Sequence, residues 1–364
     1  MHNRQAKRSR RCVNDDPVRR RAWRAGEVAV KVVSIVVVGM LIAGNARGQA
    51  LLHDVPDSIP APAATTTPPR DAAPVFKSSV DLVALNVVVT DRKRHFVSGL
   101  QSQDFAVYED GVKQDVSFFA ATAVPLDLAI LLDTSASMTD KLRTVQQAAT
   151  GFAATLRPGD RAMVVDIKDA TRILQPLTAD VSAVDAAIAH TIAKGGTALY
   201  NGLYLTLNEL TKQRRRDDDV RRQAIVVLSD GEDTASLVAF DDVMAQAKEA
   251  NIAVYTIMLK SAYRPPPVSA RDARFYSESD FAMKSLAQET GALSFFPTDI
   301  RDLSGVYVSI AQELASQYAL GYVSNNPVQD GRYRRLLVRV EDHPEASLRT
   351  RSGYLAPRAS AAGR

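Results

Sequence analysis

The amino-acid sequence predicts an α/β fold: a doubly wound, mostly parallel sheet inserted in or flanked by a small β-sandwich made of N- and C-terminal strands. Apolar strand-like runs alternate with helix-like runs from Leu126 to about residue 316, which is the order of a parallel sheet with crossover helices. Two of these runs, 126–132 and 224–229, are almost continuously apolar, as expected for strands covered on both faces. Strand-like segments precede and follow this region, and because two or three strands alone seldom form a stable unit, we expect the two flanks to build one sandwich.

The segment ahead of the alternating region has the period of two that is typical of β-strands. Apolar side chains alternate along 83–89, and further strand-like runs at 105–109 and 114–119 flank a Glu-Asp-Gly turn. These are hairpin signals. We therefore expect strands here and no helix before about Thr139.

In the alternating region, the predicted strands are 126–132, 162–167, 224–229, 252–258 and 293–296. The predicted helices are 138–156, 180–193, 199–213, 240–250, 279–290 and 302–316. In the first predicted helix, apolar residues repeat at helical spacing and share one face. Strands return after Gln317, at 318–323, 333–340 and 347–354.

Two groups of charged residues are interpreted as solvated surface. Six arginines crowd the C-terminal strands, namely Arg332, Arg334, Arg335, Arg339, Arg349 and Arg351. We interpret them as a solvated face of the sheet rather than as an anion-binding patch. The run 212–222 mixes arginines with three aspartates and is interpreted as an exposed loop.

The chain has 364 residues, enough for two domains, and its charge is unevenly distributed. Residues 1–50 carry 11 of the 45 Lys and Arg but only 3 of the 41 Asp and Glu. The remaining 34 basic and 38 acidic residues give the rest of the chain a net charge of −4. A body of this charge lacks the general basic footprint of a nucleic-acid-binding protein, and we expect no nucleic acid among its partners.

The basic head precedes an apolar stretch, an order typical of a secretory signal. Arginines between 19 and 24 lead into 28–43, whose uninterrupted apolar core, 35–43, is short for a spanning helix. Gly48-Gln49-Ala50 offers a small-x-small cleavage site. We expect export to the periplasm or the cell exterior, with anchoring to the inner membrane by an uncleaved N-terminus as the alternative.

The position of the single cysteine excludes cysteine-dependent sites from the body of the protein. Cys12 is the only cysteine of the chain, and it lies in the part expected to be removed or left inside. The exported body therefore has no disulfide, thiolate nucleophile or cysteine-ligated metal.

These observations predict the following division of the chain: a signal peptide or N-terminal anchor at 1–50, a Pro/Ala/Thr-rich spacer at 51–78, a β-rich flank at 79–122, an α/β domain at 123–316, a second β-rich flank at 317–357 and a tail at 358–364.

The most informative residues are Asp133, Ser135 and Ser137, in the stretch DTSAS directly after the apolar run 126–132. A carboxylate and two hydroxyls leave the tip of a predicted buried strand and lead into a predicted helix. Oxygen ligands of this kind suit a hard cation such as Mg²⁺. The same residues can also cap a helix, and capping is compatible with ligation.

Two further segments offer oxygen ligands. Thr197 follows a pair of glycines, and Asp230 comes directly after the predicted strand 224–229. Because ligands of an open parallel sheet bind at the carboxyl ends of its strands, we expect these side chains to join those after 126–132. Asp166, near the end of another predicted strand, is interpreted as solvent-facing.

Together the three segments resemble the metal-ion-dependent adhesion site of von Willebrand factor type A domains, the fold also used by integrin inserted domains. Over about residues 80–357, with runs such as LQSQDFAVYEDG and SQYALGYVSNNP, the chain resembles the von Willebrand factor type A-related proteins of Acidobacteria. The resemblance implies that Ser135 and Ser137 bind the ion directly. It also implies that Asp133 and Asp230 act directly or through water, and that Thr197 contributes in one state of the site.

The resemblance implies an adhesion-type protein-binding module that uses Mg²⁺ or Mn²⁺. Neutral hydroxyl ligands leave the charge of the ion partly uncompensated, and the ion then keeps a water. A carboxylate of a partner protein can displace this water. We expect no catalytic residue, no organic cofactor and no enzymatic activity.

Two alternatives belong to other classes. A Mg²⁺-dependent hydrolase could use the ion to activate water or Ser135 as a nucleophile, but a serine nucleophile needs a base. The exported body has four histidines, none in a recognisable catalytic motif: His53, His95, His190 and His343. The other alternative is a structural envelope scaffold whose metal site is vestigial.

Overall fold

The computed structural model describes residues 82–121, 124–217, 220–230, 233–259, 278–341, 343 and 345–358. The chain divides into Met1–Pro74 and a second compact unit, Val75–Arg364, and all described residues belong to the second. The predicted signal or anchor with Cys12, and the predicted spacer, lie outside these residues. In the described ranges, no helix combines the length and the apolarity needed to cross a bilayer.

A six-stranded sheet forms the centre of the α/β part, in the order β10-β9-β8-β5-β6-β7. Its strands are β5 Leu126–Asp133, β6 Arg161–Ile167, β7 Arg172–Thr178, β8 Arg222–Ser229, β9 Ala253–Met258 and β10 Ser294–Phe295. Neighbouring strands are parallel except for β6 and β7, which are antiparallel. The mostly parallel sheet predicted from the sequence is therefore confirmed, with the edge strand β7 as an addition.

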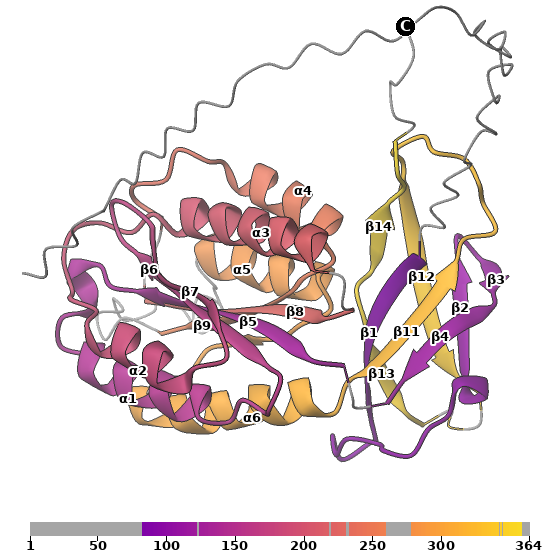
Figure 1. Cartoon of the computed structure of the whole chain (residues 1–364), viewed down its shortest axis with the longest axis horizontal. Helices are drawn as coiled ribbons and strands as arrows, with labels where there is room; N and C mark the ends of the chain where they lie inside the picture. Colours follow the sequence, from indigo (N-terminus) through magenta and orange to yellow (C-terminus); the bar gives the residue numbers. More distant parts are fainter. Residues whose placement is uncertain are drawn as a thin grey trace, which may run out of the picture. The chain divides into compact units, whose positions relative to one another are not determined.

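Helices cover both faces of this sheet, as Figure 1 shows. On one face pack α1 Leu142–Ala153, α2 Val181–Ala189 and α6 Leu303–Ala315. On the other face pack α3 Leu199–Arg216, α4 Phe240–Ala250 and α5 Glu278–Glu289. The central strands β5 and β8 are buried along their whole length because each is covered on both sides.

The flanking segments form two four-stranded sheets, with the orders β13-β1-β11-β4 and β14-β12-β2-β3. Their strands are β1 Leu82–Thr90, β2 Phe105–Glu109, β3 Val112–Gln114, β4 Val116–Ala120, β11 Tyr318–Val323, β12 Tyr333–Val340, β13 Ser347–Arg349 and β14 Gly353–Leu355. Inward side chains of both sheets share one apolar core. Each sheet takes strands from both flanks, as the sequence predicts.

Two predicted strands are wrong in detail, since each is divided between the two sheets. The run 114–119 breaks at Asp115, so that β3 pairs with β2 while β4 pairs with β11. The run 347–354 breaks after Arg349, so that β13 pairs with β1 and β14 with β12. A period-two pattern places side chains on alternate faces but does not say which neighbour a strand hydrogen-bonds to.

A buried polar cluster joins the helical layer to the sandwich. Arg349 of β13 forms an ion pair with Glu313 of α6. The Tyr255 hydroxyl donates to Glu313 Oε1 at 2.6 Å, and Gln317 Nε2 donates to that hydroxyl at 3.0 Å. Thus α6 is linked to the sandwich by side chains as well as by the direct run of the chain into β11.

Candidate metal centre

Asp133 ends β5 and is fully buried. Its Oδ1 accepts from the backbone N–H of Ser135 at 2.9 Å, and its Oδ2 accepts from the Ser229 hydroxyl at 2.5 Å. Ser229 is the last residue of β8, the strand next to β5. The carboxylate is therefore held in one orientation at the carboxyl edge of the sheet.

A row of oxygen atoms runs from this strand end to Asp230. Ser135 Oγ lies 2.9 Å from Ser137 Oγ, and the Ser137 hydroxyl donates to Asp230 Oδ1 at 2.7 Å. Ser135 is buried, whereas Ser137 is exposed. The structure thus brings four of the predicted residues, Asp133, Ser135, Ser137 and Asp230, into one hydrogen-bonded group that opens to the surface.

Thr197 is joined to this group through the backbone of its loop. The N–H of Ala136 donates to the Gly195 carbonyl at 2.9 Å, which places the two loops side by side. Thr197 is buried, and its N–H donates to the Thr234 hydroxyl at 3.0 Å. Gly195 has a φ of +78° and a Cβ there would collide with the Asp169 carboxylate, so glycine is needed for this approach.

Lys141 is a contributor that the sequence analysis missed. Its ammonium pairs with Asp230 Oδ2, and the Asp230 side chain is almost fully buried. A positive charge therefore already rests on one carboxylate of the group. The position of Lys141 just before α1 does not predict this contact from the sequence, because the contact depends on how the chain turns between Ser137 and Leu142.

The electrostatics of Asp133 favour a nearby cation. Burial raises the pKa of Asp133, hydrogen bonds from Ser135 and Ser229 oppose this rise, and the charge of Asp230 adds to it. The donors Ser135 and Ser229 are neutral, so they satisfy the carboxylate without cancelling its charge. A bound cation would stabilise the ionised form of both aspartates.

The chemistry of this donor set fits a hard divalent ion. It offers two carboxylates and three hydroxyls, all oxygen atoms, which suit Mg²⁺ or Mn²⁺ better than softer metals. Over the described ranges, no group of three or more His, Cys, Asp and Glu side chains is placed to hold a metal. The fit rests on serine and threonine hydroxyls beside two carboxylates, with Lys141 as a cation on one of them.

Two details differ from the sequence analysis. Asp166 is buried rather than solvent-facing, because it accepts from the Thr134 hydroxyl and pairs with Lys168 at 2.6 Å. The predicted start of the first helix at residue 138 is also wrong. One 3₁₀ turn, Ala136–Met138, follows the strand, and α1 begins at Leu142.

The remaining polar groups near the site have other partners. Asp233 accepts from the N–H groups of Tyr200 and Ser236 at 2.8 and 2.9 Å, so it holds the start of α3. Among the described histidines, His95 contacts Asp91 and His190 contacts a carbonyl of its own helix. These two rings are engaged elsewhere, and neither is bonded to Ser135.

Comparison with known proteins gives a family match within the α/β part. Residues 128–232 match the family model of the von Willebrand factor type A domain, which includes all five predicted ligands. An uncharacterized protein from Synechocystis sp. is 34% identical over 112 residues, which are 30% of this chain and 26% of that protein. The chain thus spans about a quarter of the length of this relative.

Solved structures give matches with low sequence identity. A von Willebrand factor type A protein from Catenulispora acidiphila is 13% identical with a TM-score of 0.44, over 79% of this chain and 76% of that chain. An aerotolerance-related membrane protein from Bacteroides fragilis is 19% identical with a TM-score of 0.40, over 52% and 98% of the two chains.

Proposed function

We propose that the von Willebrand factor type A domain of this chain is an exported, divalent-metal-dependent protein-binding module, which recruits an acidic group of a partner protein. Domains of this family are protein-interaction modules. The metal dependence, the carboxylate ligand and the export are the further steps proposed here.

The observation that carries the proposal is the chain of hydrogen bonds that joins oxygen-bearing residues at two neighbouring strand ends. Asp133, Ser135, Ser137 and Asp230 are linked by contacts of 2.7 to 2.9 Å. In the proposed site these residues and Thr197 hold Mg²⁺ or Mn²⁺. When bound, the ion supplies a positive charge that a carboxylate of the partner can meet.

The chain's own residues determine which ligand is preferred. Ser135 and Ser137 are neutral, and one of the two carboxylates, Asp230, already pairs with Lys141, so the site keeps positive charge for an acidic partner when the ion is bound. Ser137 is exposed and marks the open side from which a partner approaches. The buried members, Asp133 and Ser135, keep the inner side closed to water.

Enzymatic hydrolysis remains the alternative of a different class, and it requires a base close to Ser135 or to a metal-bound water. Among described residues, Ser135 is bonded to Ser137 and Asp133, whereas the described histidines contact groups outside the site. A scaffold with a vestigial site is the second alternative, and it predicts that no metal binds.

The first test is titration of the purified full chain with Mg²⁺ and with Mn²⁺, in which binding is measured by calorimetry and by thermal melting. Asp133→Ala and Ser137→Ala are the test variants, and Asp241→Ala is the matched control, since Asp241 is an exposed acid at the start of α4. The proposal expects saturable binding in the parent and the control, and its loss in both test variants.

A second measurement addresses the partner. Acetate or an acidic peptide, added after the metal, should bind only when the metal is present and only to proteins with an intact site. If the parent binds no metal, even with added acetate, the scaffold alternative is favoured. If metal binds but a model substrate is hydrolysed in an Asp133-dependent way, the hydrolase alternative is favoured.

A further inference from the structure

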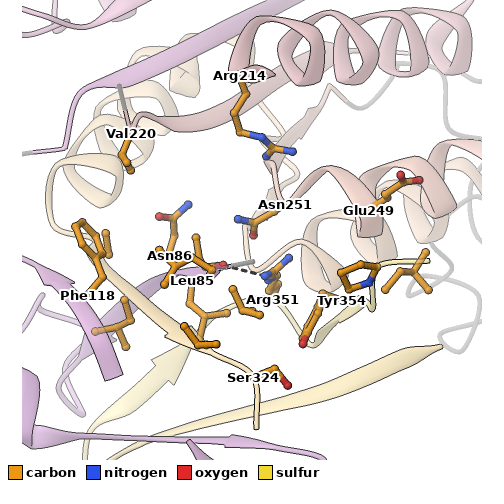
Figure 2. Close-up of a pocket in the computed structure, with 18 of the residues that line it drawn as sticks. Leu85, Asn86, Phe118, Arg214, Val220, Glu249, Asn251, Ser324, Arg351 and Tyr354 are labelled. Atoms are coloured by element: carbon orange, nitrogen blue, oxygen red, sulfur yellow. Dashed lines mark hydrogen bonds between the residues drawn. The ribbon is translucent and has the colours of Figure 1, made fainter. Parts of the chain in front are cut away.

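A large hollow lies at the opposite end of the central strands from the metal centre. It has a volume of about 920 Å³ and is lined by parts of β1, α3, β11 and β14, by the start of β8 and by Val124 just ahead of β5 (Figure 2). Since β5 and β8 are eight residues long, the two sites are roughly 25 Å apart at about 3.3 Å per residue. We call this hollow the arginine pocket.

Arg351, on the short link between β13 and β14, is a buried charge of the arginine pocket. Its exposed fraction is 9%, and its Nη2 donates to the Ala84 carbonyl at 2.9 Å. Its Nε is buried without a hydrogen-bond partner among the described residues. The guanidinium also stacks at 5.3 Å from the centre of the Tyr354 ring. A buried cation that meets a carbonyl and a ring, with one N–H unused, is incompletely satisfied.

Arg214 reaches the same hollow from the last turn of α3. Its Nη1 donates to the Ala250 carbonyl at 2.5 Å, so it too meets a carbonyl rather than a carboxylate. Figure 2 shows both guanidinium groups directed into the hollow from different walls. Burial, together with repulsion from Arg214, lowers the pKa of Arg351 to about 10. Two like charges that face one hollow therefore destabilise each other.

The other charged groups that line the arginine pocket do not neutralise these two. Arg334 is paired with Glu109, Arg221 with Asp127, and Asp217 with Arg161. Arg222 donates to the Leu314 carbonyl at 2.7 Å, and Arg215 adds a further positive charge at the rim. Figure 2 shows the carboxylate of Glu249 directed away from both guanidinium groups.

The rim of the arginine pocket carries exposed aliphatic side chains beside Arg215. Leu82, Val220, Val323 and Val328 have exposed fractions of 44%, 65%, 43% and 53%, and all four line the hollow. Exposed aliphatic side chains gathered around a concave site are typical of ligand pockets. The pocket thus combines unneutralised guanidinium groups with an apolar rim.

We propose that the arginine pocket binds an amphipathic anion, whose carboxylate or phosphate lies between Arg214 and Arg351 and whose apolar portion covers the rim. The anion would accept from guanidinium N–H groups of the two arginines, which bind such oxyanions in a bidentate manner. This site is separate from the proposed metal centre and does not depend on it. The sequence interpretation of these arginines as solvated surface is wrong for Arg214, Arg334 and Arg351.

The test is calorimetric titration of the full chain with four probes below their aggregation concentrations. Decanoate and decyl phosphate carry both features, decanol lacks the charge, and inorganic phosphate lacks the apolar chain. The variants are Arg214→Gln and Arg351→Gln. Arg335→Gln is the control, because Arg335 is exposed on β12 and lies outside the lining of the pocket.

The proposal expects saturable binding of decanoate or decyl phosphate, at least tenfold weaker in each pocket variant and unchanged in the control. The stronger of the two probes identifies the oxyanion. Equal binding of decanol, equal binding of inorganic phosphate, or binding that survives Arg214→Gln overturns the proposal. If Arg351→Gln fails to fold by circular dichroism, Arg214→Gln decides alone, because it lies at the end of a helix.

Discussion

The two ends of strand β5 carry the same side chain in opposite electrostatic settings. Asp127 and Asp133 are both buried, with exposed fractions of 1% and 0%. Asp127 accepts two hydrogen bonds from Arg161, at 2.9 and 2.8 Å, and a third from Arg221 at 2.7 Å. Asp133 accepts from serines, and none of the ion pairs among the described residues includes it.

The difference shows that partners, rather than burial or residue type, decide whether a carboxylate is available to a ligand. Asp127 is neutralised by guanidinium groups and serves the fold. Asp133 keeps an uncompensated charge on the inner side of a site, and a cation can relieve it. The same contrast, with the signs reversed, separates the paired Arg334 from the incompletely satisfied Arg351 in the arginine pocket.

Loss of the Asp127 charge is expected to have the largest effect on stability. Asp127→Asn leaves Arg161 and Arg221 without their buried partner, and breaking such a pair costs about 3 kcal/mol or more. Chemical denaturation measures this cost. Asp241→Asn, at an exposed position, is the control and should change the free energy of unfolding by less than about 0.5 kcal/mol. Metal affinity should be unchanged, since Asp127 lies at the other end of the strand.

Loss of the Asp133 charge should lower metal affinity and leave stability almost unchanged. Asp133→Asn keeps the shape of the side chain but removes the charge of a metal ligand. Metal affinity should fall at least about 100-fold, because mutation of a residue that only hydrogen-bonds to a metal ligand already lowers metal affinity 10–100-fold. Calorimetric titration measures the loss, and a melting temperature close to that of the parent shows that the fold is intact. Equal metal affinity in Asp133→Asn and the parent would contradict the assignment of the site.

Glu109 extends the comparison to a third buried carboxylate. Burial alone would raise its pKa, but hydrogen bonds from Tyr322, Ser324 and Tyr354 and the charge of Arg334 outweigh this, so the pKa of Glu109 is lowered. The ionised form is therefore more stable in the folded protein than in the unfolded chain. Its stabilisation is complete above the ordinary value of 4.5 and is lost as the pH falls through the lower folded value.

Glu109→Gln should cost about 2 kcal/mol at neutral pH, because it leaves Arg334 unpaired, and the cost should shrink below pH 4.5. Denaturation curves recorded at several pH values measure this. Glu341→Gln is the control, since Glu341 pairs with Lys113 on the exposed surface and such pairs contribute at most about 1 kcal/mol. Parallel pH profiles of Glu109→Gln and the parent would show that the charge of Glu109 is unimportant.

Lys141 should have the smallest effect. Its ammonium rests on Asp230 and competes with a metal ion for that carboxylate. Lys141→Met should therefore raise metal affinity about fivefold, which corresponds to roughly 1 kcal/mol. Titration with Mg²⁺ measures the gain. Lys212→Met, at a lysine paired with Glu209 on the surface of α3, should leave the affinity unchanged, and weaker binding in Lys141→Met would mean that the lysine assists the site.

The sequence predicted those parts of the molecule that depend on local periodicity. The six helices and five strands of the α/β part follow apolar patterns that can be read from a short window. The edge strand β7 was missed, because its side chains are only partly buried and it contains Pro176. The division of 347–354 into two strands was also missed, since it depends on which of two sheets each half joins.

The candidate site shows the same limit. Asp133, Ser135 and Ser137 could be named because they are two residues apart at a strand end, and Asp230 because it ends the neighbouring strand. Ser229 and Lys141 could not, because an ordinary serine and an ordinary lysine carry no motif. Their contribution comes from the distance to one carboxylate, and that distance exists only in the folded chain.

The way the two flanks share their strands has a consequence for how the chain matures. β1 pairs with β11 from Leu82↔Val323 to Val87↔Tyr318, and roughly 200 residues separate the end of β4 from the start of β11. At about 5–20 residues per second, synthesis of that stretch takes on the order of ten seconds or more. During this interval β1 has open edges that invite intermolecular pairing. We expect the sandwich to close last, after the α/β part, so that the two sites meet their ligands on a chain whose β-rich flanks have only then paired.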